Sequence, residues 1–306
     1  MKNALVIGAT GLLGYGVTQE LSMCGWNVRA IGNNNVSSKL FHHSVRYECG
    51  DFYDESFLKN MLLGIDKVFF FLSSTFPSTS SDSLELEISR SLSGLDYLLR
   101  KMRDLGIKEI VFPSSGGTVY GNVVEGFAKE DSKLSPTSPY GVGKKMCEEV
   151  LQFYAQFGIS ATILRVGNVY GSTLIRKTSQ GVIDVFVQKA MDGETATIWG
   201  DALSSVRDYI FVDDFAKAVS LIGNFKAEGV EVFNLGSGVG TSLQEIVNII
   251  NEMTNNSLNI EHINNNSTSS IKRIVLDMSK FKNHTGWEPS IDIKTGIAKT
   301  IERKKF

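Results

Sequence analysis

A glycine-rich turn stands almost at the start of the chain and constrains the fold more than any other feature. Residues 2–7 form an aliphatic run, the turn Gly8-Ala-Thr-Gly-Leu-Leu-Gly14 follows without a spacer, and a helical pattern of apolar residues begins directly after it. In this context the first glycine permits a tight turn, the second lets the backbone approach a pyrophosphate, and the third lets the helix pack on the strand. The sequence therefore predicts a dinucleotide-binding unit whose cofactor contacts are Gly8, Thr10, Gly11, Leu12, Leu13 and Gly14.

Strands and helices alternate over most of the chain. The strands that we expect are 4–8, 27–31, 45–48, 67–72, 109–113, 160–165 and 232–235, and the long helices are 84–105 and 144–157. The run 67–72 is apolar after its first residue, which is typical of a central strand buried on both faces. This alternation predicts an α/β fold with a doubly wound parallel sheet.

The alternation becomes less regular after residue 171, where a second part of the chain is expected. One of its helices is marked by a capping box, Ser242 and Glu245, before an apolar run. We expect residues 1–171 plus about 207–235 to form the dinucleotide-binding domain. A smaller, discontinuous C-terminal lobe of about 172–206 plus 236–306 would then bind the substrate, with the Asn-rich tract 264–270 as an exposed loop.

The composition argues against several classes of protein. The formal net charge of −2 provides no basic field for nucleic acid or an anionic membrane surface. No run approaches the ~20 apolar residues of a membrane span, and a core strand stands where a signal peptide would be. Cys24, Cys49 and Cys147 lack a Cys-x-x-Cys spacing, and the histidines lack ligand spacing, so neither a disulfide nor a metal site is expected. These observations predict a soluble cytoplasmic protein.

Tyr140 and Lys144 form a candidate catalytic pair. A spacing of four residues places both on one face of a helix, and an ammonium beside a phenol favours the phenolate. Such a tyrosine can exchange a proton with a sugar hydroxyl while a nicotinamide exchanges a hydride. Taken alone, Tyr-x-x-x-Lys is equally typical of an amphipathic helix start. Its position after the Ser/Gly/Thr-rich run 114–121, in a chain that opens on a glycine turn, favours the catalytic interpretation.

Six motifs together give the chain a family resemblance. They are Gly8-Ala-Thr-Gly-Leu-Leu-Gly14, Gly50-Asp51-Phe52, Ser114-Ser-Gly-Gly-Thr-Val-Tyr-Gly121, Tyr140-Gly-Val-Gly-Lys144, Arg165-Val-Gly-Asn168-Val-Tyr-Gly171 and Arg207-Asp-Tyr-Ile-Phe-Val-Asp-Asp214. In this order, over residues 3–301, they resemble the extended short-chain dehydrogenase/reductases, in the nucleotide-sugar branch that includes UDP-glucose 4-epimerase. The resemblance implies a Rossmann-type fold, a nicotinamide dinucleotide, a nucleotide-sugar substrate and, through helices 84–105 and 144–157, a homodimer.

The resemblance also implies roles for single residues. Asp51 would accept a hydrogen bond from the adenine, and Asn168 would bind the phosphate or ribose side of the substrate. Arg207 would grip the diphosphate with its planar fork; the alternative is a surface ion pair with Asp208 or Asp213. The further cofactor contacts implied are Phe52, Leu72, Ser73, Ser114, Tyr140 and Lys144.

Two departures from the family pattern bear on the chemistry. Gly32 stands where many relatives end the second strand with an acidic residue that holds the ribose of NAD. Without that carboxylate NADP becomes slightly favoured over NAD, with Asn33 as a candidate contact. Gly116 stands where relatives have a catalytic serine or threonine, so Ser115 or Thr118 would have to supply the hydroxyl.

These features leave three functions open. The first is reduction of a dTDP- or other NDP-linked 4-keto-6-deoxyhexose at C4, as in the synthesis of deoxysugars for surface polysaccharides such as O-antigen. The alternative is a 4-epimerase of UDP-glucose or UDP-N-acetylglucosamine that retains its NAD. The third is a cofactor-sensing protein without chemistry, which the intact Tyr140 and Lys144 disfavour.

Overall fold

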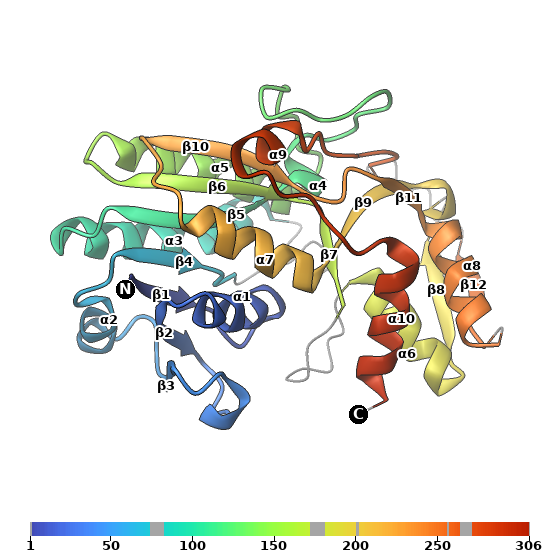
Figure 1. The fold of residues 1–306 in the computed structure, drawn as a ribbon. Coiled ribbons are helices and arrows are strands. Elements are labelled where there is room, and N and C mark those ends of the chain that lie inside the picture. The colour runs from blue at the N-terminus through green and yellow to red at the C-terminus, as the bar shows by residue number, and fades with distance from the viewer. Residues whose placement is uncertain are drawn as a thin grey trace. The chain divides into compact units, whose positions relative to one another are not determined.

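The computed structural model describes residues 2–73, 83–171, 181–199, 202–255, 257–263 and 271–305 (Figure 1). The expected loop at 264–270 lies outside these residues. The chain divides into two compact units, which are described separately. Unit 1 comprises Met1–Ser115, Pro139–Arg165 and Ala216–Phe233, and unit 2 comprises Gly116–Ser138, Val166–Phe215 and Asn234–Phe306.

A seven-stranded sheet is the centre of unit 1. Its order is β10-β6-β5-β4-β1-β2-β3, and the pairs from β3 through β2, β1 and β4 to β5 are parallel. The strands are β1 (Asn3–Ile7), β2 (Asn27–Gly32), β3 (Val45–Cys49), β4 (Lys67–Phe70), β5 (Glu109–Ser115), β6 (Ser160–Val166) and β10 (Val230–Leu235). Chain order reverses between β1 and β4, which is the point where doubly wound sheets bind ligands. The predicted strands and the doubly wound sheet are confirmed.

Apolar side chains from both faces of this sheet form the core of unit 1. Val68 and Phe70 of β4 belong to a cluster with helices α2, α3 and α5, whereas Phe69 contacts Trp26 edge-on, with ring centroids 5.9 Å apart. The predicted burial of this strand on both faces is therefore correct. The helices of unit 1 are α1 (Leu12–Met23), the short 3₁₀ turn η1 (Ser38–Leu40), α2 (Glu55–Leu62), α3 (Leu84–Asp104), α5 (Pro139–Ala155) and the second half of α7 (Val212–Gly223).

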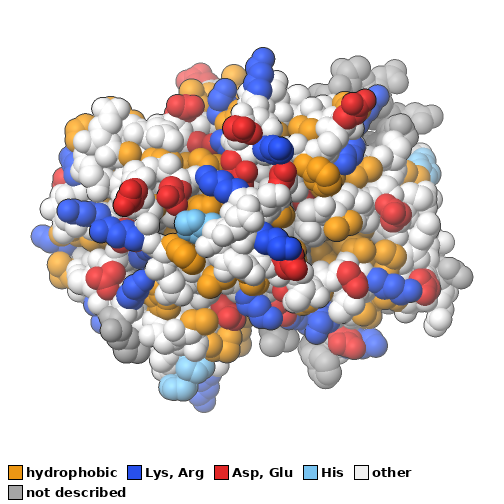
Figure 2. Space-filling model, turned by 45° about the horizontal axis from the view of Figure 1, so that its top comes forward, with side chains coloured by type: hydrophobic (Ala, Val, Ile, Leu, Met, Phe, Trp, Pro, Cys, Tyr) orange, Lys and Arg blue, Asp and Glu red, His pale blue; other side chains and the backbone are white. Residues whose placement is uncertain are grey.

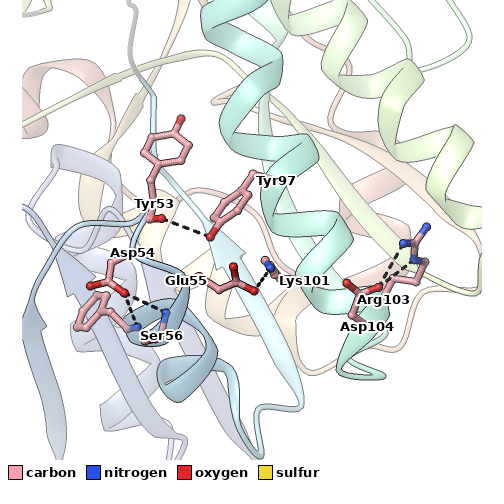
Figure 3. A network of polar contacts seen from close by, with 9 residues as sticks. Tyr53, Asp54, Glu55, Ser56, Tyr97, Lys101, Arg103 and Asp104 are labelled. Atoms are coloured by element: carbon pink, nitrogen blue, oxygen red, sulfur yellow. Dashed lines mark hydrogen bonds and ion pairs between the residues drawn. The ribbon is translucent and has the colours of Figure 1, made fainter.

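Polar contacts tie the start of α2 to the exposed side of α3 (Figure 3). Asp54 caps α2 by accepting hydrogen bonds from the backbone N–H groups of residues 56 and 57. Lys101 pairs with Glu55 at 2.5 Å, and the Tyr97 hydroxyl donates to the Tyr53 carbonyl at 3.5 Å. Because exposed ion pairs stabilise little, this network orients the two helices while the apolar cluster beneath supplies most of the free energy.

Unit 2 is built on smaller sheets. β9 pairs in parallel with β7 and antiparallel with β11, while β8 pairs in parallel with β12. The predicted capping box is present, since Ser242 accepts from the Glu245 N–H and Glu245 accepts from the Ser242 N–H. The elements of unit 2 are α4 (Gly116–Val119), β7 (Asn168–Tyr170), α6 (Val182–Asp192), β8 (Thr195–Trp199), η2 (Ala202–Ser204), β9 (Val206–Phe211), the start of α7, β11 (Gly240–Ser242), α8 (Leu243–Met253), β12 (Asn259–Ile263), α9 (Ser279–Thr285) and α10 (Ile293–Lys304).

Asp208 organises the middle of unit 2. Its side chain is buried in β9 and accepts four hydrogen bonds: from the N–H and hydroxyl of Ser237, and from the N–H groups of Gly238 and Leu276, at 2.6 to 3.1 Å. Burial raises the pKa of the Asp208 carboxyl, and these donors oppose that shift. One carboxylate thus joins β9 to two segments that lie 29 and 68 residues later in the chain.

The observed units differ in extent from the predicted domains. Unit 2 includes residues 116–138, 166–171, 207–215 and 234–235, which the sequence analysis placed in the dinucleotide-binding domain. The division of cofactor and sugar binding between the two parts stays a prediction.

The face of the molecule shown in Figure 2 mixes both signs of charge. On the face in Figure 2, Lys and Arg side chains are interspersed with Asp and Glu. Within the described ranges, no helix is both long and apolar enough to cross a membrane.

Candidate active site

The glycine turn joins β1 to α1 in a very small space. Gly8 has a φ of 86°, and a Cβ added there would lie 2.8 Å from the carbonyl carbon of Phe71, which follows β4. At Gly14 a Cβ would collide with the Gly8 carbonyl. Only glycine fits either position, because the first needs a left-handed backbone and the second a helix pressed against the turn. The turn geometry expected from the sequence is therefore present, while its contacts with a cofactor stay predicted.

The N-terminus of α1 differs from those of its neighbours. Its N-cap, Gly11, offers no side-chain acceptor, and its first turn contains no acidic residue. By contrast, Asp54 caps α2 and Ser83 caps α3, and both helices have glutamates in their first turns. Unsatisfied N–H groups and the positive end of a helix dipole attract anions, so α1 is the one of these three helices that suits a phosphate.

Tyr47 occupies the space beside Gly32 at the end of β2. A Cβ on Gly32 would lie 2.8 Å from the Tyr47 hydroxyl oxygen and 2.9 Å from the Thr10 hydroxyl oxygen. The Tyr47 hydroxyl donates to the Asn34 carbonyl at 2.5 Å, and the Asn34 amide donates to Thr10 at 3.3 Å. Burial, with the neighbouring Cys49, raises the pKa of Tyr47 to about 12, so its hydroxyl remains a donor. The close packing of Tyr47 and Thr10 therefore explains the glycine at position 32 without reference to the cofactor.

The other predicted cofactor residues of this edge have different environments. Asp51 is exposed after β3 and accepts a hydrogen bond from the Tyr53 N–H at 2.9 Å. Phe52 is buried against Phe70, so its ring belongs to the core. Asn33 is exposed, while Leu72 and Ser73 are half-buried directly after β4. The ends of β1, β2, β3 and β4 place these residues at one edge of the sheet.

Tyr140 and Lys144 lie on the first turns of α5. Lys144 is only 9% exposed; its Nζ donates to the Pro113 carbonyl at 3.0 Å and lies 4.9 Å from the centre of the Phe112 ring. The same Nζ is 5.8 Å from the centre of the half-buried Tyr140 ring. The structure therefore brings the predicted pair together, with the ammonium fixed beside the end of β5.

The candidate hydroxyl residues fall on both sides of a unit boundary. Ser114 is buried in β5 and donates to Glu148 at 2.5 Å, and Ser115 ends the strand half-buried. Thr118 is half-buried in the short helix α4, which belongs to unit 2. Ser115 therefore lies in the same unit as Tyr140, while the position of Thr118 against Tyr140 is left as a prediction.

Unit 2 contains the predicted substrate residues. Asn168 lies on β7, opposite Tyr209 of β9. Its side chain is close to Gly117, since a Cβ added to that glycine would lie 3.1 Å from the Asn168 Oδ1. The Arg207 guanidinium donates to the Val206 and Lys272 carbonyls, at 3.0 and 3.4 Å, and to the Ile271 carbonyl.

The alternative of an ion pair for Arg207 is wrong. Asp208 is held by four other donors, as described above, and Asp213 pairs with Arg303 at 2.7 Å. Backbone carbonyls hold Arg207 instead, and burial lowers its pKa from the ordinary arginine value. Part of its donor capacity is therefore already used within unit 2.

Sequence reasoning missed three residues around the site, namely Tyr47, Glu148 and Arg165. Glu148 forms a buried ion pair with Arg165 at 2.7 Å. A signal for Glu148 was available, because it stands four residues after Lys144 on the same helical face, between the apolar positions Cys147 and Leu151. Tyr47 gave no comparable signal, since its proximity to Gly32 depends on the pairing of β2 with β3.

Comparisons with known proteins agree with this arrangement. The model of the NAD dependent epimerase/dehydratase family matches residues 4–236. The chain is 29% identical over 308 residues to the UDP-glucose 4-epimerase of Mycolicibacterium smegmatis, covering 97% of each protein. It is 30% identical over 232 residues to the dTDP-4-dehydro-6-deoxyglucose reductase of Escherichia coli, covering 74% of this chain and 71% of the relative.

A solved structure extends the similarity to the whole chain. The structure of a Thermus thermophilus UDP-glucose 4-epimerase in complex with NAD superimposes with a TM-score of 0.88 over 99% of each chain, at 26% identity. The Rossmann-type fold predicted from the sequence is thereby confirmed.

Proposed function

The chain belongs to the NAD dependent epimerase/dehydratase family, and from that premise we propose that it is a nicotinamide-dinucleotide-dependent enzyme acting at C4 of a nucleotide-linked hexose. The observation that supports this most is the anchored pair of Tyr140 and Lys144, because a phenol and a fixed ammonium beside a dinucleotide-binding edge form a proton-transfer device.

The residues of unit 1 suit a dinucleotide. The uncapped N-terminus of α1 would hold the pyrophosphate, and Thr10, Asn34 and Tyr47 would face the adenosine ribose. When bound, the nicotinamide supplies and takes up hydride. Tyr140 takes the proton of the sugar C4 hydroxyl as the carbonyl forms and returns it when the carbonyl is reduced. Lys144, held by the Pro113 carbonyl, would stabilise the phenolate form of Tyr140, which is present before the proton is taken up and again after it is returned.

We place 4-epimerisation of a UDP-hexose, with retained NAD, before 4-ketoreduction. The two relatives of nearly full length described above, from Mycolicibacterium smegmatis and Thermus thermophilus, are UDP-glucose 4-epimerases by name, and the second is solved with NAD. The sequence argument for NADP depended on the absence of a carboxylate at position 32. The close packing of Tyr47 and Thr10 already explains why this residue is glycine. Moreover, Thr10, Asn34 and Tyr47 are uncharged, which suits ribose hydroxyls better than a 2′-phosphate.

Reduction of an NDP-linked 4-keto-6-deoxyhexose is the second candidate. Gly116 is buried and has no hydroxyl to hold the sugar oxygen. Reducing one face of a ketone also needs fewer positioned donors than serving both faces. The similarity to the Escherichia coli reductase, over about three quarters of this chain, agrees with this candidate. In either case Asn168 and Arg207 would contact the nucleotide part of the substrate.

A homodimer through α5 is part of the proposal. Met146 and Phe153 are 40 and 53% exposed and lie seven residues apart on the outer face of α5. Phe157 is 50% exposed; it follows the helix, and its ring lies 5.2 Å from that of Phe153. Such an apolar stripe is typical of helix-to-helix contacts between subunits. Sedimentation equilibrium of the protein and of Phe153→Glu tests this: the proposal expects a dimer that the substitution weakens, and a monomeric protein contradicts it.

The reaction is decided by offering both substrates to the purified protein. We would first identify any retained cofactor by mass spectrometry of the denatured protein. UDP-glucose and UDP-N-acetylglucosamine would then be incubated without added reductant, and dTDP-4-keto-6-deoxyglucose with NADH or NADPH. Formation of C4 epimers from the UDP-sugars supports the epimerase. Stoichiometric oxidation of NADH or NADPH by the keto sugar, with no epimers from the UDP-sugars, supports the reductase instead. No reaction in either assay contradicts the proposed function.

A further inference from the structure

A buried ion pair lies directly behind the candidate catalytic residues. Glu148 of α5 and Arg165 of β6 are each 7% exposed, and the carboxylate accepts from the Arg165 Nη2 at 2.7 Å and from its Nε at 3.2 Å. Ser114 of β5 donates to the same carboxylate at 2.5 Å. One side chain therefore joins a helix to two adjacent strands of the sheet.

Glu148 and Lys144 act on two successive residues of β5. Lys144 donates to the carbonyl of Pro113, and Glu148 accepts from the side chain of Ser114. Lys144 and Glu148 are four residues apart, so they lie on neighbouring turns of the same helical face. The end of β5, which leads into Ser115, is thus fixed to α5 at two consecutive points.

Stability alone does not explain a charged pair in this place. The neighbouring positions of α5 that face the sheet, Cys147 and Leu151, pack in the apolar core with Ile163 of β6. Apolar residues of similar volume commonly stabilise a core as well as a buried ion pair does, because both charges lose their hydration. What a bidentate pair adds is a defined geometry, which an apolar contact does not impose.

We propose that Glu148 is a positioning residue for the Tyr140–Lys144 pair: with Arg165 and Ser114, it fixes the register of α5 against β5 and β6, so that Lys144 keeps its bond to the Pro113 carbonyl. This inference rests on the proposed function for its catalytic consequence. Its structural part, the restraint of the first turns of α5, holds for the protein whatever its substrate.

The test replaces the ion pair by apolar residues in the full-length protein. In Glu148→Leu/Arg165→Met we expect a melting temperature near that of the parent and KM within about threefold. We expect kcat to fall by about 10- to 100-fold, since a small misplacement of a catalytic group is enough for such a loss. Hydrogen–deuterium exchange in residues 139–147 should become faster in the same variant. Glu148→Gln, which keeps the shape of the side chain, replaces it if the double variant does not fold.

The control is a partly buried ion pair elsewhere in unit 1. Lys67 and Glu109 pair at 2.8 Å at the first residues of β4 and β5, the opposite ends of those strands. Lys67→Met/Glu109→Leu should lower the melting temperature, because Lys67 also donates to the Gly223 and Phe225 carbonyls, which then lose that donor. It should leave kcat within about threefold, because the anchoring of α5 stays intact.

Two results would overturn the proposal. One is a Glu148 variant that keeps the parental kcat. A variant whose kcat falls only together with its stability counts the same way, because any structural defect would give that result. The other is unchanged exchange in residues 139–147, which decides the question even if the parent protein acts on neither sugar substrate. Inactivity of the parent, by contrast, contradicts the proposed function and not the restraint of α5.

Discussion

The substitution Gly32→Asp is expected to destabilise the protein through Tyr47. The new Cβ would lie 2.8 Å from the Tyr47 hydroxyl oxygen and 2.9 Å from that of Thr10, so at least one of the two must move. Overpacking of this kind costs about 1–3 kcal/mol, and losing the Tyr47–Asn34 hydrogen bond about 0.5–1.5 kcal/mol. We therefore expect the free energy of unfolding to fall by about 2–4 kcal/mol.

A double-mutant cycle with Tyr47→Phe measures this contact directly. Removing the hydroxyl alone should destabilise by about 1 kcal/mol, since it leaves the partly buried Asn34 carbonyl without this donor. It also makes room for the aspartate, so the double variant should be more stable than additivity predicts, by about 1 kcal/mol. Urea unfolding of the four proteins gives the coupling energy. Additivity within about 0.5 kcal/mol would refute the contact that we assign to Gly32.

The same double variant tests cofactor selectivity. A carboxylate at position 32 should repel a 2′-phosphate and raise the ratio of NAD to NADP affinity by about tenfold or more. Tyr47→Phe alone is the control, because it adds no charge, and it should change that ratio by less than about threefold. Titration calorimetry with both nucleotides measures the ratio, and an unchanged ratio in the double variant would show that residue 32 does not face the ribose.

Three further predictions concern single residues. Tyr140→Phe should fold normally and lower turnover by about 10²- to 10⁴-fold in whichever sugar assay is positive, whereas near-parental turnover would remove its role as proton carrier. Gly94→Ala in α3 should stabilise by about 0.5–1 kcal/mol in thermal unfolding, because its Cβ would meet neighbours only at 3.5 Å or more. Gly143→Ala in α5 should not stabilise, because its Cβ would lie 2.6 Å from the hydroxyl oxygen of Ser91 in α3; equal effects would contradict this close approach of the two helices. Asp208→Asn should destabilise by about 2–4 kcal/mol, because an amide nitrogen cannot accept from the two N–H groups that its oxygen served; denaturation near the parental midpoint would contradict this.

The sequence predicted most of the sheet because the signals of its strands are local. Each predicted strand is present, and its ends differ from the prediction by at most two residues. The largest difference in the helices is at α5, which begins at Pro139 rather than 144, so Tyr140 lies inside the helix. Proline is well tolerated at the first position of a helix, a start signal that the sequence analysis did not use.

The site itself was predicted in its residue types and only partly in its contacts. The glycine turn and the Tyr140–Lys144 spacing are short-range patterns, and both have the expected local geometry. The surface ion pair considered for Arg207 was wrong, because the guanidinium turns to carbonyls 64 and 65 residues away in the chain. No local pattern reports such partners.

The sequence by itself determined the elements of this protein, its doubly wound sheet and the residues at the carboxyl edge of that sheet. Those properties follow from hydrophobic period, turn chemistry and spacing along a few neighbouring residues. Only the tertiary structure decided which groups restrain them: Tyr47 beside Gly32, Pro113 beneath Lys144, and Glu148 between Ser114 and Arg165. These contacts arise where strands and helices distant in sequence pack together, and packing geometry is set by the whole core rather than by any one segment.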